Sequence, residues 1–166
     1  MNIWGQAWKS YIPPGRRVYG CICITPTNKV LLVQGRQGEK KWSFPKGHRE
    51  PTDISPIDCA LRELKEETGI TLNQSFIFTK RFRAGEYFIY QVPMELDATP
   101  EDYREIQSVR WCTIGEMEQL NKNVDVSLFT QEVKRAFEEM KSTPQSLSDP
   151  LYQDTRQISD GVPTCA

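Results

Sequence analysis

The segment from Ser55 to Ile70 constrains the fold more than any other part of this chain, because both ends of a helix are marked in it. Ser55 is a good N-cap, Pro56 suits the first helical position, and Gly69 suits a C-terminal cap. Apolar residues recur at helical spacing and predict one buried face: Ile57, Ala60, Leu61 and Leu64. The sequence therefore predicts a helix over roughly residues 56–68.

Strand-like segments surround this helix on both sides. Runs rich in apolar and β-favouring residues cover 18–24, 30–33, 76–83, 86–95 and 107–113, with a short extended piece at 42–44. Helical periodicity returns at 127–140, where Phe129, Val133, Phe137 and Met140 form one stripe. One helix in the middle of the chain and one near its end, among strands, predict a mixed α/β layered domain.

The two ends of the chain differ in composition from its middle. Residues 1–15 contain two tryptophans and a tyrosine before a Pro-Pro-Gly turn, and we expect an arm that docks by these aromatic side chains. Residues 16–141 contain the predicted domain, and the polar stretch 142–166 is expected to be disordered. A length of 166 residues suits one domain.

Net charge and cysteine content limit the classes of function. The formal net charge is −1, so no overall field directs the chain to nucleic acid or to a membrane, and binding of a polyanion needs a local basic patch. The five cysteines are odd in number and lack CxxC spacing, and the four in apolar stretches are expected to be reduced core thiols. No apolar run is long enough to span a membrane. We expect a cytoplasmic protein, with the nucleus left open.

Three glutamates, Glu63, Glu66 and Glu67, lie within five positions of the predicted helix. At about 100° per residue their carboxylates project within one sector, away from the apolar face. Like charges this close repel each other unless a cation lies between them, and Mg²⁺ prefers such oxygen ligands together with substrate phosphates. The alternative is a solvated acidic helix face. The preceding arginine, the glycine cap and a Pro-Lys-Gly loop before the helix favour the metal site.

The stretch that begins at Gly47, GHREPTDISPIDCALRELKEETGI, resembles the Nudix box. Its second half, which begins at Arg62, has the family's residue at every fixed position. Its first half departs from the pattern, because Gly47 and Arg62 are fifteen positions apart where the family has fourteen. The family's early glutamate falls on Asp53 if the extra residue lies after it, near Ile54, and Glu50 is the alternative partner for Arg62.

The resemblance implies a Nudix α/β/α sandwich with a mixed central sheet. It also implies hydrolysis of a nucleoside diphosphate linked to another moiety, with Mg²⁺ or Mn²⁺ as cofactor. The implied catalytic and metal-binding positions are Arg62, Glu63, Glu66, Glu67 and the backbone carbonyl of Lys46 or Gly47. Metals at Glu63 and Glu67 bridge phosphate oxygens in such a site, and Glu66 or a later acid takes the proton of the attacking water. Glu105, at the start of EIQSVRW, resembles the later acid that relatives place at the metals, and a surface glutamate is the alternative.

Three substrate classes are in competition. The segments VYGCICI, VLLVQGR, WSFPKG, IDCALRE and EIQSVRW together resemble the catalytic domain of mRNA decapping enzymes, which release m7GDP from capped RNA. PKGHREP is similar to the pattern of animal-type dinucleoside tetraphosphate hydrolases, and a small basic Nudix domain also resembles diphosphoinositol polyphosphate phosphohydrolases. We rank capped RNA first. The alternative of another class is a non-catalytic nucleotide- or RNA-binding module, against which the intact box glutamates argue. The oligomeric state stays open.

Basic and aromatic side chains supply candidates for substrate binding. The cationic candidates are Arg36, Lys46, His48, Arg81 and Arg83. Arg81 and Arg83 are two apart and are predicted to share one strand face. The candidates for stacking on a base are Trp42, Phe88 and Tyr90. Ordinary surface charge and core packing are the respective alternatives.

Overall fold

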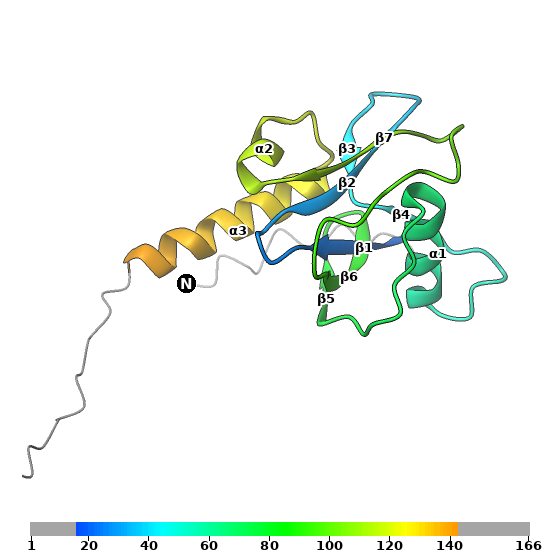
Figure 1. The fold of residues 1–166 in the computed structure, drawn as a ribbon, viewed down its shortest axis with the longest axis horizontal. Helices are drawn as coiled ribbons and strands as arrows, with labels where there is room; N and C mark the ends of the chain where they lie inside the picture. The colour runs from blue at the N-terminus through cyan, green and yellow to red at the C-terminus, as the bar shows by residue number, and fades with distance from the viewer. Residues whose placement is uncertain (1–15, 143–166) are drawn as a thin grey trace, which may run out of the picture.

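The computed structural model describes residues 16–142, which form a seven-stranded sheet with helices on both of its faces (Figure 1). The strands are β1 (Val18–Ile24), β2 (Val30–Gly35), β3 (Trp42–Ser43), β4 (Lys46–His48), β5 (Phe78–Arg81), β6 (Gly85–Gln91) and β7 (Ile106–Cys112). The helices are α1 (Pro56–Thr68), α2 (Ile114–Gln119) and α3 (Val124–Ser142). The predicted aromatic arm and nearly all of the predicted polar tail lie outside the described residues.

The sheet is mixed, because β1 pairs in parallel with β6 and antiparallel with β2 and β4. The main path runs β3-β2-β1-β6-β5, with β4 paired to β1 and β7 paired to β2. One row of directly paired residues crosses four strands: Gly47, Tyr19, Glu86 and Arg81. In this row, β1 and β6 lie between Gly47 on β4 and Arg81 on β5.

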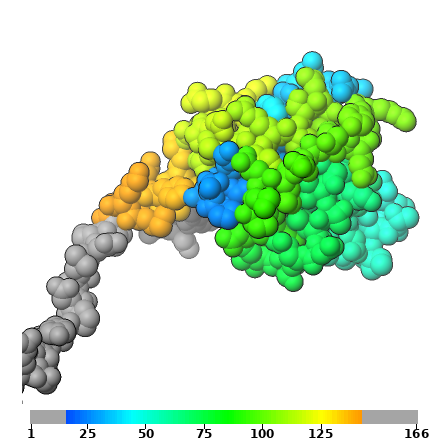
Figure 2. Space-filling view, viewed as in Figure 1, coloured from blue at the N-terminus to red at the C-terminus, as the bar shows by residue number. Residues whose placement is uncertain are grey.

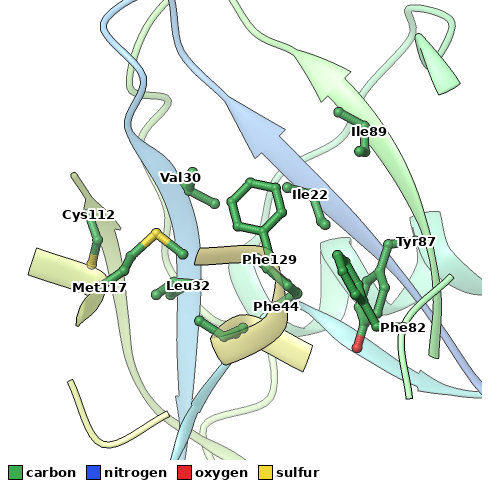
Figure 3. Close-up of a cluster of buried hydrophobic side chains, with 11 residues drawn as sticks. Ile22, Val30, Leu32, Phe44, Phe82, Tyr87, Ile89, Cys112, Met117 and Phe129 are labelled. Carbon is green, nitrogen blue, oxygen red and sulfur yellow. The ribbon is translucent and has the colours of Figure 1, made fainter. Parts of the chain in front are cut away.

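Side chains alternate along β1, so the two faces of the sheet pack against different helices. Cys21 and Cys23 belong to the cluster that includes Leu64 of α1, whereas Ile22 belongs to the cluster that includes Phe129 of α3. Figure 3 shows the second cluster, in which the labelled side chains are Ile22, Val30, Leu32, Phe44, Phe82, Tyr87, Ile89, Cys112, Met117 and Phe129. The three-layer arrangement around a mixed sheet confirms the predicted fold class.

Helix α1 begins and ends where the sequence predicts. The Ser55 hydroxyl accepts a hydrogen bond from the Asp58 N–H at 3.3 Å, and the Asp58 carboxylate accepts one from the Ser55 N–H at 2.9 Å. This reciprocal pair is a capping box. Gly69 ends the helix at a φ of 71°, in the left-handed region that favours glycine. The directions of the box glutamates are therefore fixed by both ends of the helix.

Helix α3 is longer than predicted. It begins at residue 124 because the Asn123 side chain accepts a hydrogen bond from the Val126 N–H at 3.0 Å, as an N-cap does. Only the first half of the predicted apolar stripe is buried, at Phe129. In the second half, Phe137 is 40% exposed and Met140 is 63% exposed. The second half of α3 extends beyond the sheet in Figure 1, so the helix forms as predicted but the second half of its stripe stays exposed.

Several other segments differ from the prediction at their ends or in kind. The predicted strand 76–83 shortens to β5, and the predicted strand 86–95 ends at Gln91. Strand β4 and helix α2 were not predicted.

Four free cysteines are buried, in agreement with the expected core thiols: Cys21, Cys23, Cys59 and Cys112. None of the helices within residues 16–142 is long and apolar enough to cross a membrane.

Candidate active site

Arg62 of α1 connects the acids of the helix with the loop that precedes it. Its Nε and Nη2 atoms each donate a hydrogen bond of 2.9 Å to the Asp53 carboxylate. Its Nη1 donates to Glu63 at 2.9 Å and to Glu66 at 3.1 Å, and Nη2 also donates to the His48 carbonyl at 3.0 Å. The bonds from Arg62 hold the pKa of Asp53 down at about 2. Asp53 therefore stays ionised and fixes the guanidinium in place.

Asp53 is the acid that pairs with Arg62, although its side chain is one methylene shorter than that of glutamate. A turn brings it within reach: the Glu50 N–H donates to the Asp53 carboxylate at 2.8 Å, and the Asp53 N–H donates to the Glu50 carbonyl at 3.0 Å. The Glu50 carboxylate itself is exposed and lies 3.8 Å from the guanidinium. Ile54, near which the extra residue of the box is predicted to lie, is 90% exposed, so added length at this point is accommodated at the surface.

The carboxylate of Glu63 lies directly against the backbone of β4. A Cβ atom placed on Gly47 would lie 2.1 Å from the Cδ and Oε1 atoms of Glu63, so any side chain there would displace the carboxylate. Burial raises the pKa of Glu63, the bonds from Arg62 oppose this, and the charges of Glu66 and Glu105 add to the increase. The carboxylate is thus held close to β4 in a site crowded with negative charge.

Glu67 is the most buried of the three box glutamates, with 6% of its surface exposed. Its carboxylate accepts a hydrogen bond from the Lys46 N–H at 3.0 Å. Burial raises the pKa of Glu67 to about 8, Lys46 opposes the increase, and the charges of Glu63 and Glu105 add to it. A buried carboxylate with like-charged neighbours is strongly stabilised by a divalent cation.

The connection between β6 and β7 is attached to the C-terminal end of α1. The Thr99 N–H donates to the Thr68 carbonyl at 2.8 Å. The Glu66 carbonyl accepts from the N–H groups of both Glu101 and Asp102, at 2.9 and 3.0 Å. These bonds satisfy carbonyls that the helix itself leaves without partners. The position of this connection is therefore coupled to the helix that contains the glutamates.

Glu105 lies at the end of the same connection, and its carbonyl accepts a hydrogen bond from the Arg36 N–H at 2.8 Å. Its side chain is exposed, yet its charge raises the pKa of both Glu63 and Glu67. Glu105 is thus within electrostatic reach of two box glutamates, although it is about forty residues away in the chain. The sequence alone could not measure this proximity.

The donor set suits Mg²⁺ or Mn²⁺, which prefer carboxylate and carbonyl oxygens. Within residues 16–142, only one of the two carboxylate oxygens of each box glutamate accepts a hydrogen bond, and the other oxygen accepts none. In this part of the chain, no three His, Cys, Asp or Glu side chains already converge as a metal cluster. The acids thus supply suitable ligands and strong mutual repulsion. The Gly47 carbonyl, one of the two backbone carbonyls predicted as a further ligand, accepts a hydrogen bond from the Cys59 thiol, with the Sγ atom 3.6 Å away.

Three of the predicted cationic candidates lie near these acids. Lys46 and His48 belong to β4, where the Lys46 charge favours the ionised form of Glu67 and the His48 carbonyl binds Arg62. Arg36 follows β2, and its Nε donates to the Tyr103 carbonyl at 2.9 Å. Arg36 therefore helps to fix the β6–β7 connection.

The other two cationic candidates are not brought to the acids. Arg81 forms an ion pair of 3.0 Å with Glu86, and in the row of paired residues β6 and β1 separate it from Gly47. Arg83 lies beyond the end of β5, so the two arginines do not share a strand face. The strand ends at Arg81 because a tight turn, closed by the Phe82 N–H and the Gly85 carbonyl, begins there.

The predicted stacking residues belong to the protein interior. Tyr90 is fully buried and Phe88 nearly so, in the cluster between the sheet and α1. Trp42 is partly buried against the cluster on the opposite face of the sheet, which includes α3. Phe88 and Tyr90 fill the core and are not available to stack on a nucleobase, so the prediction was wrong for these two residues, whereas for the partly buried Trp42 it stays a prediction.

An exposed tyrosine that the sequence reading did not select lies beside the acids. Tyr103, which is 60% exposed, lines a pocket of about 580 Å³ together with Glu66, Glu101, Asp102 and Arg104. The space-filling view in Figure 2 shows the surface over which the β6–β7 connection (yellow-green) adjoins the segment that contains α1 (green). The only signal in the sequence is one aromatic residue in an otherwise polar run, EDYRE, which by itself is uninformative.

Comparison with known proteins gives a consistent family. A model described as the NUDIX domain matches residues 14–132. The chain is 31% identical over 123 residues to the m7GpppN-mRNA hydrolase dcap-2 of Caenorhabditis elegans, which is 68% of this chain and 15% of that protein. It is 34% identical over 112 residues to the asymmetrical bis(5'-nucleosyl)-tetraphosphatase of Sus scrofa, which is 61% of this chain and 76% of that protein. The chain spans about a sixth of the decapping proteins that it matches in Caenorhabditis elegans and Schizosaccharomyces pombe.

Solved structures agree on the fold. A C. elegans Ap4A hydrolase superposes with a TM-score of 0.60 at 19% identity, over 74% of this chain and 99% of that chain. The NUDIX domain of Shewanella oneidensis NrtR, complexed with ADP ribose, superposes with a TM-score of 0.58 at 18% identity, over 77% of this chain and 94% of that chain. At these identities the likeness concerns the fold alone.

Proposed function

This chain belongs to the NUDIX domain family, and we propose that it is a Mg²⁺- or Mn²⁺-dependent pyrophosphohydrolase that cleaves a phosphoanhydride of a nucleoside diphosphate-linked substrate. One observation supports this most directly. Glu105 comes from a distant segment of the chain, and its charge raises the pKa of both Glu63 and the buried Glu67, to which the charge of Glu63 also contributes. A folded protein keeps such repulsion at a cost in stability, which a bound cation offsets.

The proposed roles follow from the contacts of each side chain. Glu63, Glu67 and Glu66 hold the cation, with Glu105 and a backbone carbonyl of Lys46 or Gly47 as further ligands. When bound, the cation supplies charge neutralisation at the phosphates and lowers the pKa of a water molecule. The Asp53 carboxylate holds the Arg62 guanidinium in place. The guanidinium in turn holds the carboxylates of Glu63 and Glu66. Glu66 or Glu105, the two more exposed acids, takes the proton from the attacking water.

We propose capped mRNA as the first candidate substrate, with release of m7GDP in the cytoplasm. The match to decapping proteins of Caenorhabditis elegans and Schizosaccharomyces pombe supports this. Two cationic side chains also support it: the Lys46 charge acts on Glu67, and the Arg36 guanidinium binds the Tyr103 carbonyl. A dinucleoside tetraphosphate is the second candidate, supported by the match that covers most of the mammalian tetraphosphatases. The diphosphoinositol phosphates are a third candidate.

A substrate panel tests the proposal. Capped RNA, free cap analogue, dinucleoside tetraphosphate and a diphosphoinositol phosphate are incubated with Mg²⁺ or Mn²⁺, and the products are separated by chromatography. We expect metal-dependent release of a nucleoside diphosphate from capped RNA. Preferred cleavage of the tetraphosphate would favour the second candidate. No turnover of any substrate, together with tight nucleotide binding, would show a binding module.

A further inference from the structure

The pocket beside Glu66 is built on a fixed backbone. The loop that carries Tyr103 is bonded to the end of α1 through the N–H groups of Glu101 and Asp102, and to residue 36 on its other side. The Ile106 N–H also donates to the Asp102 carbonyl at 3.1 Å. A loop backbone held in this way loses little freedom when a ligand binds to the side chains that it carries. Within residues 16–142, Tyr103 belongs to neither hydrophobic cluster, so the packing of these clusters does not require an aromatic side chain at this position.

The charges around the pocket are predominantly negative. Three carboxylates line it, those of Glu66, Glu101 and Asp102, against one guanidinium, that of Arg104. Glu66 and Asp102 already accept hydrogen bonds, from Arg62 and from the Arg104 N–H respectively. The Glu101 carboxylate accepts none within residues 16–142 and is exposed. A ligand that fits here therefore offers N–H donors and positive charge, together with a flat face for Tyr103.

We propose that this pocket binds the base of the substrate, and that Tyr103 with Glu101 selects a positively charged 7-methylguanine over neutral guanine. Methylation at N7 gives the base a delocalised positive charge, which is attracted to the face of the Tyr103 ring. The negative charge of Glu101 adds to this attraction, and its carboxylate can also accept hydrogen bonds from the N–H groups on the guanine edge, which both bases have. The pocket volume is in the range of small-molecule sites, and Glu66 joins it to the acids.

The inference rests on the proposed function for its choice of base, and it is tested by binding alone. The dissociation constants of m7GDP and GDP are measured by calorimetry with Mg²⁺, using the full chain. We expect m7GDP to bind at least about fivefold tighter than GDP, in line with a partly exposed cation–π contact. Tyr103→Ala should remove most of this preference and Tyr103→Trp should retain it. Glu101→Gln should reduce the preference, whereas Asp97→Asn, an exposed acid outside the pocket, should leave it unchanged.

Each outcome decides one of the two proposals. Equal affinity for m7GDP and GDP, or a preference that survives Tyr103→Ala, overturns the base pocket even if capped RNA is hydrolysed. A Tyr103-dependent preference for m7GDP supports the pocket even if the chain hydrolyses no capped RNA, in which case the proposed reaction fails and the binding site stands. Thermal unfolding of each variant confirms that the exposed substitutions leave the fold intact.

Discussion

Glu67 is the side chain on which the metal site depends most. It is buried, it lies within reach of two other acids, and it is bonded to the backbone of β4. We expect Glu67→Gln to lower turnover by at least about 100-fold, because a charge that stabilises the transition state is lost. Steady-state kinetics with saturating Mg²⁺ measure this. Activity near that of the unmodified chain would remove Glu67 from the site.

The same carboxylate predicts a pH dependence of stability in the metal-free protein. The pKa of Glu67 is about 8 in the folded state against an ordinary value of 4.5, so the folded state binds the proton more tightly. The stability that neutral Glu67 contributes is present below about pH 4.5 and is lost as pH rises through about 8. Glu67→Gln stays neutral, and should exceed the unmodified chain in free energy of unfolding by about 4 kcal/mol at pH 8.

Urea unfolding in the presence of a chelator, at pH 5 and pH 8, measures this difference. Added Mg²⁺ should stabilise the unmodified chain at pH 8 more than it stabilises the variant, because the ion replaces the proton on the carboxylate. A difference that is the same at both pH values would mean that Glu67 ionises freely in the folded protein.

Glu105 tests the contribution of the β6–β7 connection. We expect Glu105→Gln to reduce turnover and to shift the pH profile, because a ligand or base near Glu63 and Glu67 has been neutralised. Asp97→Asn, an exposed acid of the same connection, is the matched control and should leave both unchanged. If the two variants behave alike, Glu105 is a surface residue.

The pairing of Arg62 shows where sequence reasoning reached its limit at this scale. The pattern identified Arg62 and offered Asp53 or Glu50 as its partner. The choice depends on two hydrogen bonds of a turn, which bring the shorter side chain closer. Spacing along the chain does not describe such bonds, and for the same reason it could not show that Tyr103 lies beside Glu66.

Among the elements, the contact of α1 with the β6–β7 connection offers a test at Gly69. Gly69 has a positive φ, and a Cβ there would lie 2.5 Å from the Thr99 carbonyl oxygen. We expect Gly69→Ala to cost about 1–3 kcal/mol of stability and to lower turnover, because the loop that carries Glu105 must move. Gly115→Ala in α2 is the control, since nothing lies within 4 Å of its Cβ position. Thermal unfolding and kinetics of both variants check this, and equal effects would contradict it.

Prediction of elements succeeded where local signals are strong. Helix α1 was located because its capping box and its terminal glycine are encoded locally. Strand β4 was missed because it has three residues, and its pairing with β1 is a long-range contact. The start of α3 was misplaced because Asn123 was not recognised as its cap.

At the scale of the whole molecule, a buried pair holds α3 against the sheet. The Tyr87 hydroxyl donates to the Asp125 carboxylate at 2.7 Å, and the Ala84 N–H donates to the same group at 3.0 Å. Tyr87→Phe should reduce the free energy of unfolding by about 1–3 kcal/mol, because the buried carboxylate loses a partner. The change leaves the charges of the box glutamates in place, so kcat should stay within about twofold. Denaturant unfolding measures the loss, and a stability equal to that of the unmodified chain would contradict it.

The three-layer architecture was predictable because apolar runs alternate with a helix that has one apolar face. The order of the strands was not, since β1 pairs with β2, β4 and β6 from quite different parts of the chain. That order determines which predicted residues meet the acids. It brings in Lys46 and excludes Arg81, although both are basic and both lie on strands.

The outward position of Ile54 has a consequence for the comparison of sequences. Arg49 Nη2 donates to the carbonyls of Asp53 and Ile54 at 3.0 and 3.1 Å, so Ile54 closes a surface turn while the Asp53–Arg62 pair keeps its geometry. Changing the length of such a loop by one residue alters its closure entropy very little. A change of one residue in this turn therefore leaves the Asp53–Arg62 pair nearly undisturbed. A search that requires a fixed number of residues between the glycine and the arginine will overlook chains of this kind, whereas one that allows a gap before the helix cap will retain them.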